Sequence, residues 1–277
     1  MFSFKNIALC GAFGFALFGF VGCGDDSSTG ASQNDISISS SNQIPTDGSI
    51  SSSSEQSLAK SSASVKIEYG ELTDERDGHT YKTVVIGTQT WMAENLNYAD
   101  SVKTPSLKGH SWCYNNLDDK CKSLGRLYSW VAAIDSVKIY EETSQECGSV
   151  VICELLNDST QVNVKIQGIC PNGWHLPNYA EWQTLIRYVG GETSGRALKS
   201  NTQWDGLNTS GFSAIPSGIN KSGLFNGVEQ NTSFWSSSTI QNAYVDAIRM
   251  NLTDFDNLVS LKNESKLYGL SVRCIKD

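Results

Sequence analysis

The chain reads Asn178-Tyr-Ala-Glu-Trp-Gln-Thr-Leu-Ile-Arg-Tyr-Val-Gly-Gly191 past its midpoint, and this segment has the signals of one amphipathic helix. Asn178 can cap the first turn, and Glu181 three residues later completes a capping-box pattern. The two final glycines are typical of a helix end. Apolar residues recur at helical spacing and form one stripe: Trp182, Leu185, Ile186 and Val189.

Segments typical of strands lie on both sides of this helix. Residues 80–86 are rich in β-branched side chains, Gly87 interrupts the pattern, and residues 88–92 resume it. Two further helices are predicted, over residues 124–137 and 194–200. The C-terminal part reads as strands at 212–215, 234–238, 243–251 and 266–275. An order of strands, helices and strands favours an α+β fold over a parallel βαβ arrangement.

Cys23 ends a short apolar segment at the N-terminal end of the sequence. Lys5 precedes the apolar run 7–22, which is shorter than the roughly twenty residues of a bilayer span and typical of a secretory signal. Phe20-Val-Gly-Cys23 is similar to the bacterial lipoprotein box, with Phe20 in place of the usual leucine. This resemblance implies cleavage before Cys23 and acylation of its thiol, so membrane contact would run through the lipid anchor only. The alternative is an ordinary signal peptide with an incidental cysteine.

A serine-rich stretch follows Cys23. Residues 24–64 contain sixteen serines and no aromatic residue. Such a segment buries too little apolar surface to offset its ordering entropy, so we expect a disordered tether. The predicted organisation is a signal peptide at 1–22, a tether at 23–66 and one folded domain at 67–277.

Composition excludes one class of partner. The hydrophobic content of 39% suits a globular core, and the formal net charge of −8 argues against nucleic acid, whose phosphates need a basic surface. We expect polysaccharide or other envelope proteins as partners.

Six cysteines lie beyond Cys23, and an even number in an exported chain predicts three disulfides. Six cysteines allow fifteen connectivities, and spacing alone does not choose among them. A thiolate zinc site is the competing interpretation, but the sequence has no C-x2-C pair and its three histidines are isolated. We therefore predict no metal and no cofactor.

Several motifs together resemble the Fibrobacter succinogenes major paralogous domain family. The matching segments are Asp77–Tyr98, Gly125–Ala133, Gly168–Pro177 with Glu181-Trp182, Gly211–Gly218, Phe234–Ser238 and Ser271–Cys274. This resemblance implies a variant of the C-type-lectin-like and formylglycine-generating-enzyme folds, with a small twisted antiparallel sheet, two main helices, long loops and disulfides. It also implies export and frequent lipid anchoring, and it implies no defined activity.

The same resemblance implies how the cysteines pair. Cys113 and Cys121 flank a short loop, and Cys147 and Cys153 lie in a second loop that we expect to be peripheral. Cys170 then pairs with Cys274 as the long-range bridge of lectin-like folds.

Tryptophan rings can stack on sugars while polar neighbours contact the hydroxyls. We expect five of the seven to belong to the core: Trp91, Trp130, Trp174, Trp182 and Trp235. Trp112 and Trp204 lie among polar residues, so they are the predicted ligand-stacking residues.

The sequence gives less support to calcium binding and to catalysis. The calcium-binding triplets of true C-type lectins are absent, and the acidic residues Asp74, Glu75 and Asp77 read as a solvated turn. The formylglycine-generating chemistry needs reactive thiolates near the C-terminal end of the fold, where Cys274 is better explained by its bridge. His175 reads as a structural hydrogen-bonding residue. We name no catalytic residue.

The sequence therefore predicts a lipid-anchored envelope protein, displayed at the outer membrane or cell surface, with a non-catalytic binding or adhesion module. Glycan is the first ligand to test. The alternative is a structural envelope protein without a small ligand, and the third interpretation is an oxidase or hydrolase.

Overall fold

The computed structural model describes residues 66–156 and 164–277. The predicted signal peptide, Cys23 and nearly all of the tether lie outside the described residues. The described part is an α+β domain with antiparallel sheets, few helices and disulfides, as the sequence predicts for its fold class.

The first sheet joins the N-terminal strands of the domain to its C-terminal end. Its order is β1-β2-β3-β12-β6, and every pair is antiparallel. The strands are β1 (Tyr69–Thr73), β2 (Thr80–Ile86), β3 (Gln89–Met92), β12 (Ile275–Lys276) and β6 (Trp174–His175). Gly87 and Thr88 separate β2 from β3, so the predicted break is confirmed.

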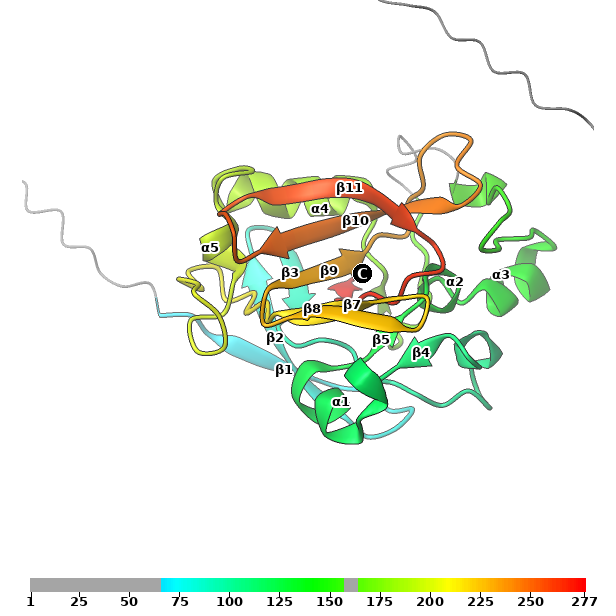
Figure 1. Ribbon diagram of the computed structural model, residues 1–277, viewed down its shortest axis with the longest axis horizontal. Helices are drawn as coiled ribbons and strands as arrows, with labels where there is room; N and C mark the ends of the chain where they lie inside the picture. The colour runs from blue at the N-terminus through cyan, green and yellow to red at the C-terminus, as the bar shows by residue number, and fades with distance from the viewer. Residues whose placement is uncertain (1–65, 157–163) are drawn as a thin grey trace, which may run out of the picture. The chain divides into compact units, whose positions relative to one another are not determined.

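The second sheet is formed by the C-terminal part of the chain, and Figure 1 shows its strands side by side. Its order is β11-β10-β9-β7-β8, with β7 parallel to β9 and the other pairs antiparallel. The strands are β7 (Ser217–Lys221), β8 (Leu224–Val228), β9 (Asn231–Trp235), β10 (Asp246–Thr253) and β11 (Val259–Ser265).

The expectation of one small sheet is thus wrong. The described chain has two five-stranded sheets and a two-stranded one, formed by β4 (Ser111–Trp112) and β5 (Leu127–Tyr128). The sequence pattern does not predict β7 and β8, because SGINK and LFNGV contain glycine and asparagine, which are depleted in strands.

The helix that opens at Asn178 forms as predicted. It is α4 (Tyr179–Tyr188), and the Asn178 side chain and the Glu181 side chain make both bonds of the capping box. The short helix predicted at 194–200 is α5 (Gly195–Leu198). The remaining helices are α1 (Asp118–Leu124), α2 (Trp130–Ala133) and α3 (Ser136–Thr143), with 3-10 turns at Pro105–Leu107, Tyr114–Asn116 and Glu154–Leu156.

The helix predicted at 124–137 is wrong in its extent. Gly125, with φ +75°, follows α1, and the Tyr128 backbone pairs with Leu270 instead of forming helical bonds. Ser129 then caps α2, and Asp135, at φ 54°, separates α2 from α3. Tertiary pairing of the backbone therefore replaces a continuous helix.

Two predicted strands are also wrong in their extent. Residues 212–215 contain a single bridge, between Ala214 and Lys199, because Ser213 has a left-handed φ of 54°. Residues 266–275 make isolated bridges to Tyr128, Asn220 and Phe234, and the strand β12 begins at their very end. The predicted strands at 234–238 and 243–251 correspond to β9 and β10, with shifted bounds.

The core divides into two clusters. One contains Trp130, Trp174 and Trp235 together with four of the disulfide-bonded cysteines. The other packs Trp91 against Trp182, with ring centroids 4.7 Å apart, and both rings against Phe212. All five tryptophans expected in the core are buried, at 0 to 6% exposure.

Disulfides join Cys113 to Cys121, Cys147 to Cys153, and Cys170 to Cys274, the same pairs that the family resemblance implies. The expectation that the Cys147–Cys153 loop is peripheral is wrong, because both cysteines are buried in the first core cluster. The third bridge spans 104 residues and ties the segment before β6 to β12.

Candidate binding site

A polar pocket of about 520 Å³ opens where segments distant in sequence meet. It is lined by β1 and β2, by residues 93–95 and 97, by the end of α1, by loop residues 200–203, by Asn208, Ser213 and Ile215, and by Arg273. Most of its lining side chains are amides, hydroxyls and charged groups. Such a surface suits a polar ligand better than an apolar one.

One wall comes from β2 and the segment after β3. Lys82 and Glu94 lie here, and a Glu94 carboxylate oxygen accepts a hydrogen bond of 2.7 Å from the Lys82 backbone N–H. Asn95 is buried, and its amide donates to the Leu124 carbonyl at 2.8 Å. These bonds hold the wall to the end of α1.

Another part of the lining is a hydrogen-bonded triad of side chains. The Asn208 amide donates to the Tyr69 hydroxyl at 3.2 Å and to the Ser213 hydroxyl at 2.8 Å. The two hydroxyls lie 3.0 Å apart. Tyr69 remains 41% exposed, so its ring is held in place by its hydroxyl while the ring itself stays accessible.

Arg273 lies at the buried base of the pocket. Its Nε donates to Asn95 Oδ1 at 2.7 Å, Nη1 donates to the carbonyls of Met92 and Phe212, and Nη2 donates to the Ser213 carbonyl at 3.0 Å. Burial lowers the pKa of Arg273 to about 9, so the side chain is a cation at neutral pH. One guanidinium thereby joins these two parts of the lining.

The end of α1 closes a third side. Gly125 has φ +75°, and a Cβ there would lie 2.6 Å from the Asn95 Cβ, so this position requires glycine. Cys121 and Lys122 line the pocket beside it, and the Cys113–Cys121 disulfide fixes their helix.

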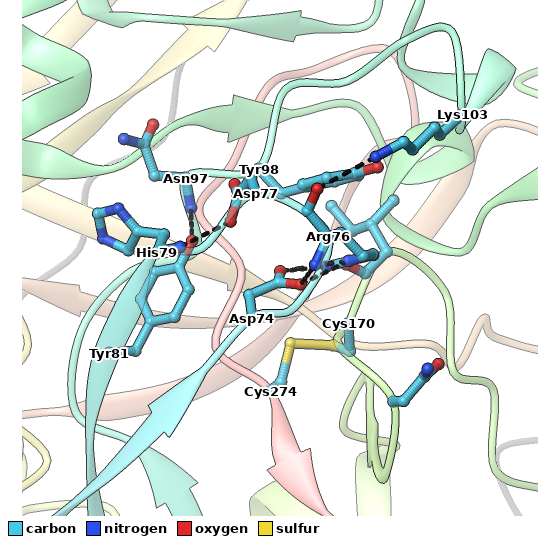
Figure 2. A network of polar contacts seen from close by, with 12 residues as sticks. Asp74, Arg76, Asp77, His79, Tyr81, Asn97, Tyr98, Lys103, Cys170 and Cys274 are labelled. Atoms are coloured by element: carbon cyan, nitrogen blue, oxygen red, sulfur yellow. Dashed lines mark hydrogen bonds and ion pairs between the residues drawn. A yellow bond between two sulfur atoms is a disulfide. The ribbon is translucent and has the colours of Figure 1, made fainter.

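A polar network adjoins the pocket through His79 and Asn97 (Figure 2). Asp74 is fully buried and forms an ion pair of 2.7 Å with Arg76, whose guanidinium lies 3.8 Å from the centroid of the Tyr98 ring. The expectation of a solvated acidic turn is therefore wrong for Asp74, because Arg76 neutralises its carboxylate and the turn folds over it.

Asn97 links the network to the pocket. Its backbone N–H donates to the Tyr81 hydroxyl at 3.0 Å, and burial raises the pKa of that hydroxyl. Its side chain points away from Arg76 in Figure 2. The Asn97 Oδ1 atom is buried and accepts no hydrogen bond from a described residue.

The predicted stacking residues lie elsewhere. Trp112 and Trp204 are both half-buried and neither lines the pocket. The Trp112 ring packs on Gly269, where an added Cβ would lie 2.9 Å from it. Trp204 packs on the second core cluster, with Lys199 Nζ 5.1 Å from its ring centroid. Both rings thus pack partly against the domain and lie outside this pocket, and their role in ligand stacking stays a prediction.

His175 is buried and makes two hydrogen bonds, one of 2.8 Å with Glu181 Oε1 and one of 2.6 Å with Asp277 Oδ1. It ties the start of α4 to the end of the chain. Within residues 66–156 and 164–277, no group of three or more His, Cys, Asp or Glu side chains could hold a metal ion. No helix in the same residues is long and apolar enough to cross a membrane.

Sequence reasoning missed Arg273 and Tyr69 as pocket residues. Arg273 stands in the apolar sequence Leu270-Ser-Val-Arg-Cys-Ile275, and a lone cation in a buried segment is a signal that could have drawn attention to it. Tyr69 carries no comparable signal, because its partners Asn208 and Ser213 are 139 and 144 residues away.

The described part of the chain is thus a disulfide-linked α+β domain with a polar pocket near its N-terminal strands. The chain belongs to the Fibrobacter succinogenes major domain family, whose model matches residues 84–276. No curated protein matches the chain, and no solved structure does.

Proposed function

We propose that the protein is a lipid-anchored component of the cell envelope whose folded domain is a non-catalytic binding module for a carbohydrate. The pocket is the observation that carries this proposal, since its polar side chains are fixed by hydrogen bonds before any ligand arrives. Pre-organised polar groups reduce the entropy lost on binding.

The chemistry of the pocket suits a sugar. Hydroxyl and amide side chains of loop 200–203 line the pocket and can donate hydrogen bonds to sugar hydroxyls or accept them. Tyr69 presents an accessible ring beside them, so it takes the stacking role that Trp112 and Trp204 were expected to have.

The remaining parts of the proposal rest on the sequence and on the bridges. Cys23 would carry the lipid and place the domain at the outer membrane or cell surface, on the tether 23–66. A C-type-lectin-like fold agrees with the antiparallel sheets and with the bridge that joins Cys170 to the C-terminal Cys274. This bridge also leaves Cys274 without the free thiol that an oxidase of the formylglycine-generating type would need.

A glycan array probed with the full chain, purified in mild detergent, tests the binding function. The Tyr69→Ala variant should lose affinity about 5- to 150-fold, if base–aromatic stacking of roughly 1–3 kcal/mol is a fair guide to sugars. Tyr244→Ala removes an exposed ring outside the pocket and should bind like the wild type.

Two results would contradict this proposal. Equal losses in the two variants would place the site elsewhere. If no glycan binds and cross-linking in whole cells joins the protein to neighbouring envelope proteins, the structural role without a small ligand is the better account.

The anchor has its own test. Replacing Cys23 with Ala should release the mature protein from washed membranes or leave an uncleaved precursor. Replacing Cys10, which lies inside the apolar run, should change neither. Unchanged membrane association of the Cys23→Ala chain would contradict the anchor.

A further inference from the structure

We infer that the pocket selects an acidic saccharide and that Arg273, Lys82 and Lys122 supply the positive charge that holds its carboxylate. This inference rests on the proposed carbohydrate-binding function and specifies the ligand class.

Arg273 is a fully buried cation without a contacting carboxylate among the described residues. Its hydrogen-bond acceptors are three backbone carbonyls and one side-chain amide oxygen. These bonds engage four of the five guanidinium N–H donors. A buried charge that dipoles alone stabilise is costly, and a nearby anion lowers this cost.

Glu94 is the carboxylate in the pocket lining, and its field acts on Arg273 without a hydrogen bond between them. The lining therefore has one acidic side chain and three cations, because Lys82 and Lys122 line the pocket together with Arg273. Neither lysine ammonium forms an ion pair with a described residue.

This local excess of positive charge runs against the composition of the whole chain, whose formal net charge is −8. Cations that gather in a concave site raise the local concentration of an anionic ligand. A neutral sugar would satisfy the amides and hydroxyls but leave the cations unused. A sugar carboxylate would satisfy both sets of groups.

The test uses two ligands with the same sugar chain: an oligogalacturonate, and the same oligosaccharide with every carboxylate neutralised as its methyl ester. Titration calorimetry on the full chain in mild detergent should show at least about tenfold tighter binding of the acid, with affinity falling as salt rises.

Arg273→Met would remove four hydrogen bonds and is expected to unfold the domain, so the lysines carry the test. The double variant Lys82→Gln, Lys122→Gln should reduce the preference for the acid about 2- to 30-fold, since each exposed charge pair changes affinity by roughly 1.4- to 5-fold. The control is Lys108→Gln with Lys262→Gln, which makes the same charge change at exposed positions outside the pocket.

The outcomes separate this inference from the function on which it rests. Equal affinity for the acid and the ester, or an equal effect of the two double variants, would overturn the acidic ligand and leave carbohydrate binding intact. Binding of neutral glycans alone, lost in Tyr69→Ala, would do the same. Failure of every saccharide to bind would overturn both.

Discussion

Lys266 shows how a single residue can join loops that share no regular structure. It is fully buried, and its Nζ donates to three backbone carbonyls, those of Val151, Ala243 and Tyr244, at 3.0, 3.2 and 3.0 Å. The ammonium also lies 4.8 Å from the centroid of the Trp130 ring. A cation therefore takes the place of a hydrophobic side chain at the centre of these loops.

Burial lowers the pKa of Lys266 to about 8, whereas the unfolded chain keeps the ordinary value of 10.5. Between these two values the unfolded state binds more protons, so this group makes the free energy of unfolding rise with pH from about 8 to 10. Lys266→Met should flatten that rise and lower the melting temperature at every pH, because the three carbonyls lose their donor. Thermal melting of both proteins at pH 7, 8, 9 and 10 measures the two slopes, and equal slopes would contradict the assignment.

The tryptophans differ in burial, and the loss of unfolding free energy on replacing each with Ala should increase with its burial. Trp182→Ala should cost about 3–5 kcal/mol, because the ring is fully enclosed between Trp91, Phe212 and Phe234. Trp112→Ala and Trp204→Ala should each cost roughly half as much, since part of each ring stays in water when folded. Urea unfolding of the three variants gives the order. A cost near zero for Trp112 or Trp204 would restore that residue as a free surface ring.

At the scale of elements, α4 is the helix whose local and tertiary contacts agree most closely. The Asn178 side chain accepts from the Glu181 N–H at 3.0 Å, and Glu181 Oε2 accepts from the Asn178 N–H at 2.9 Å. The other oxygen of Glu181 is bonded to His175, which is bonded in turn to Asp277. One carboxylate thus serves the helix start and the C-terminal end together.

The two halves of this capping box should therefore differ in importance. Asn178→Ala should cost about 1 kcal/mol, the usual value of a lost cap. Glu181→Ala should cost more, roughly 2–3 kcal/mol, because it also leaves a nitrogen of the buried His175 without its partner. Urea titration decides the order, with the exposed Glu192→Ala as the control. A smaller cost for Glu181→Ala than for Asn178→Ala would mean that the histidine bond adds nothing.

Helix α4 and strand β2 show which parts of the fold could be predicted from the sequence. The bounds of α4 and β2 follow from local signals, since caps and β-branched residues act within a few positions. The division of 124–137 depends on Leu270, which pairs with Tyr128 from far along the chain, and no local pattern reveals that contact. The pocket was missed for the same reason, because Arg273 meets Asn95 across 178 residues.

At the scale of the whole domain, the C-terminal strand β12 is an inner strand of the first sheet. Strand β12 sits between β3 and β6, so residues from both ends of the domain share one sheet. Arg273 and Cys274 precede this strand and connect it to the pocket wall and to Cys170. The pocket is therefore complete only when the C-terminal segment of the domain has packed against its N-terminal part.

The disulfides should contribute to this closure in proportion to the chain that each encloses. The Cys170–Cys274 bridge closes 104 residues, and the Cys147–Cys153 bridge closes 6. In the chain-entropy model these loops correspond to about 4.7 and about 2 kcal/mol. Replacing both cysteines of the long bridge with Ala should therefore lower the free energy of unfolding by about 2–3 kcal/mol more than the same change in the short bridge.

Chemical unfolding of the two double variants under non-reducing conditions measures this difference, after peptide mapping of the wild type has verified the pairs. All four cysteines are buried, so removing their sulfur atoms leaves comparable cavities and the loop term should dominate the comparison. Equal losses would mean that packing around Cys147 and Cys153 outweighs chain closure. In that case the second loop, and not the C-terminal bridge, would be the main covalent support of the first core cluster.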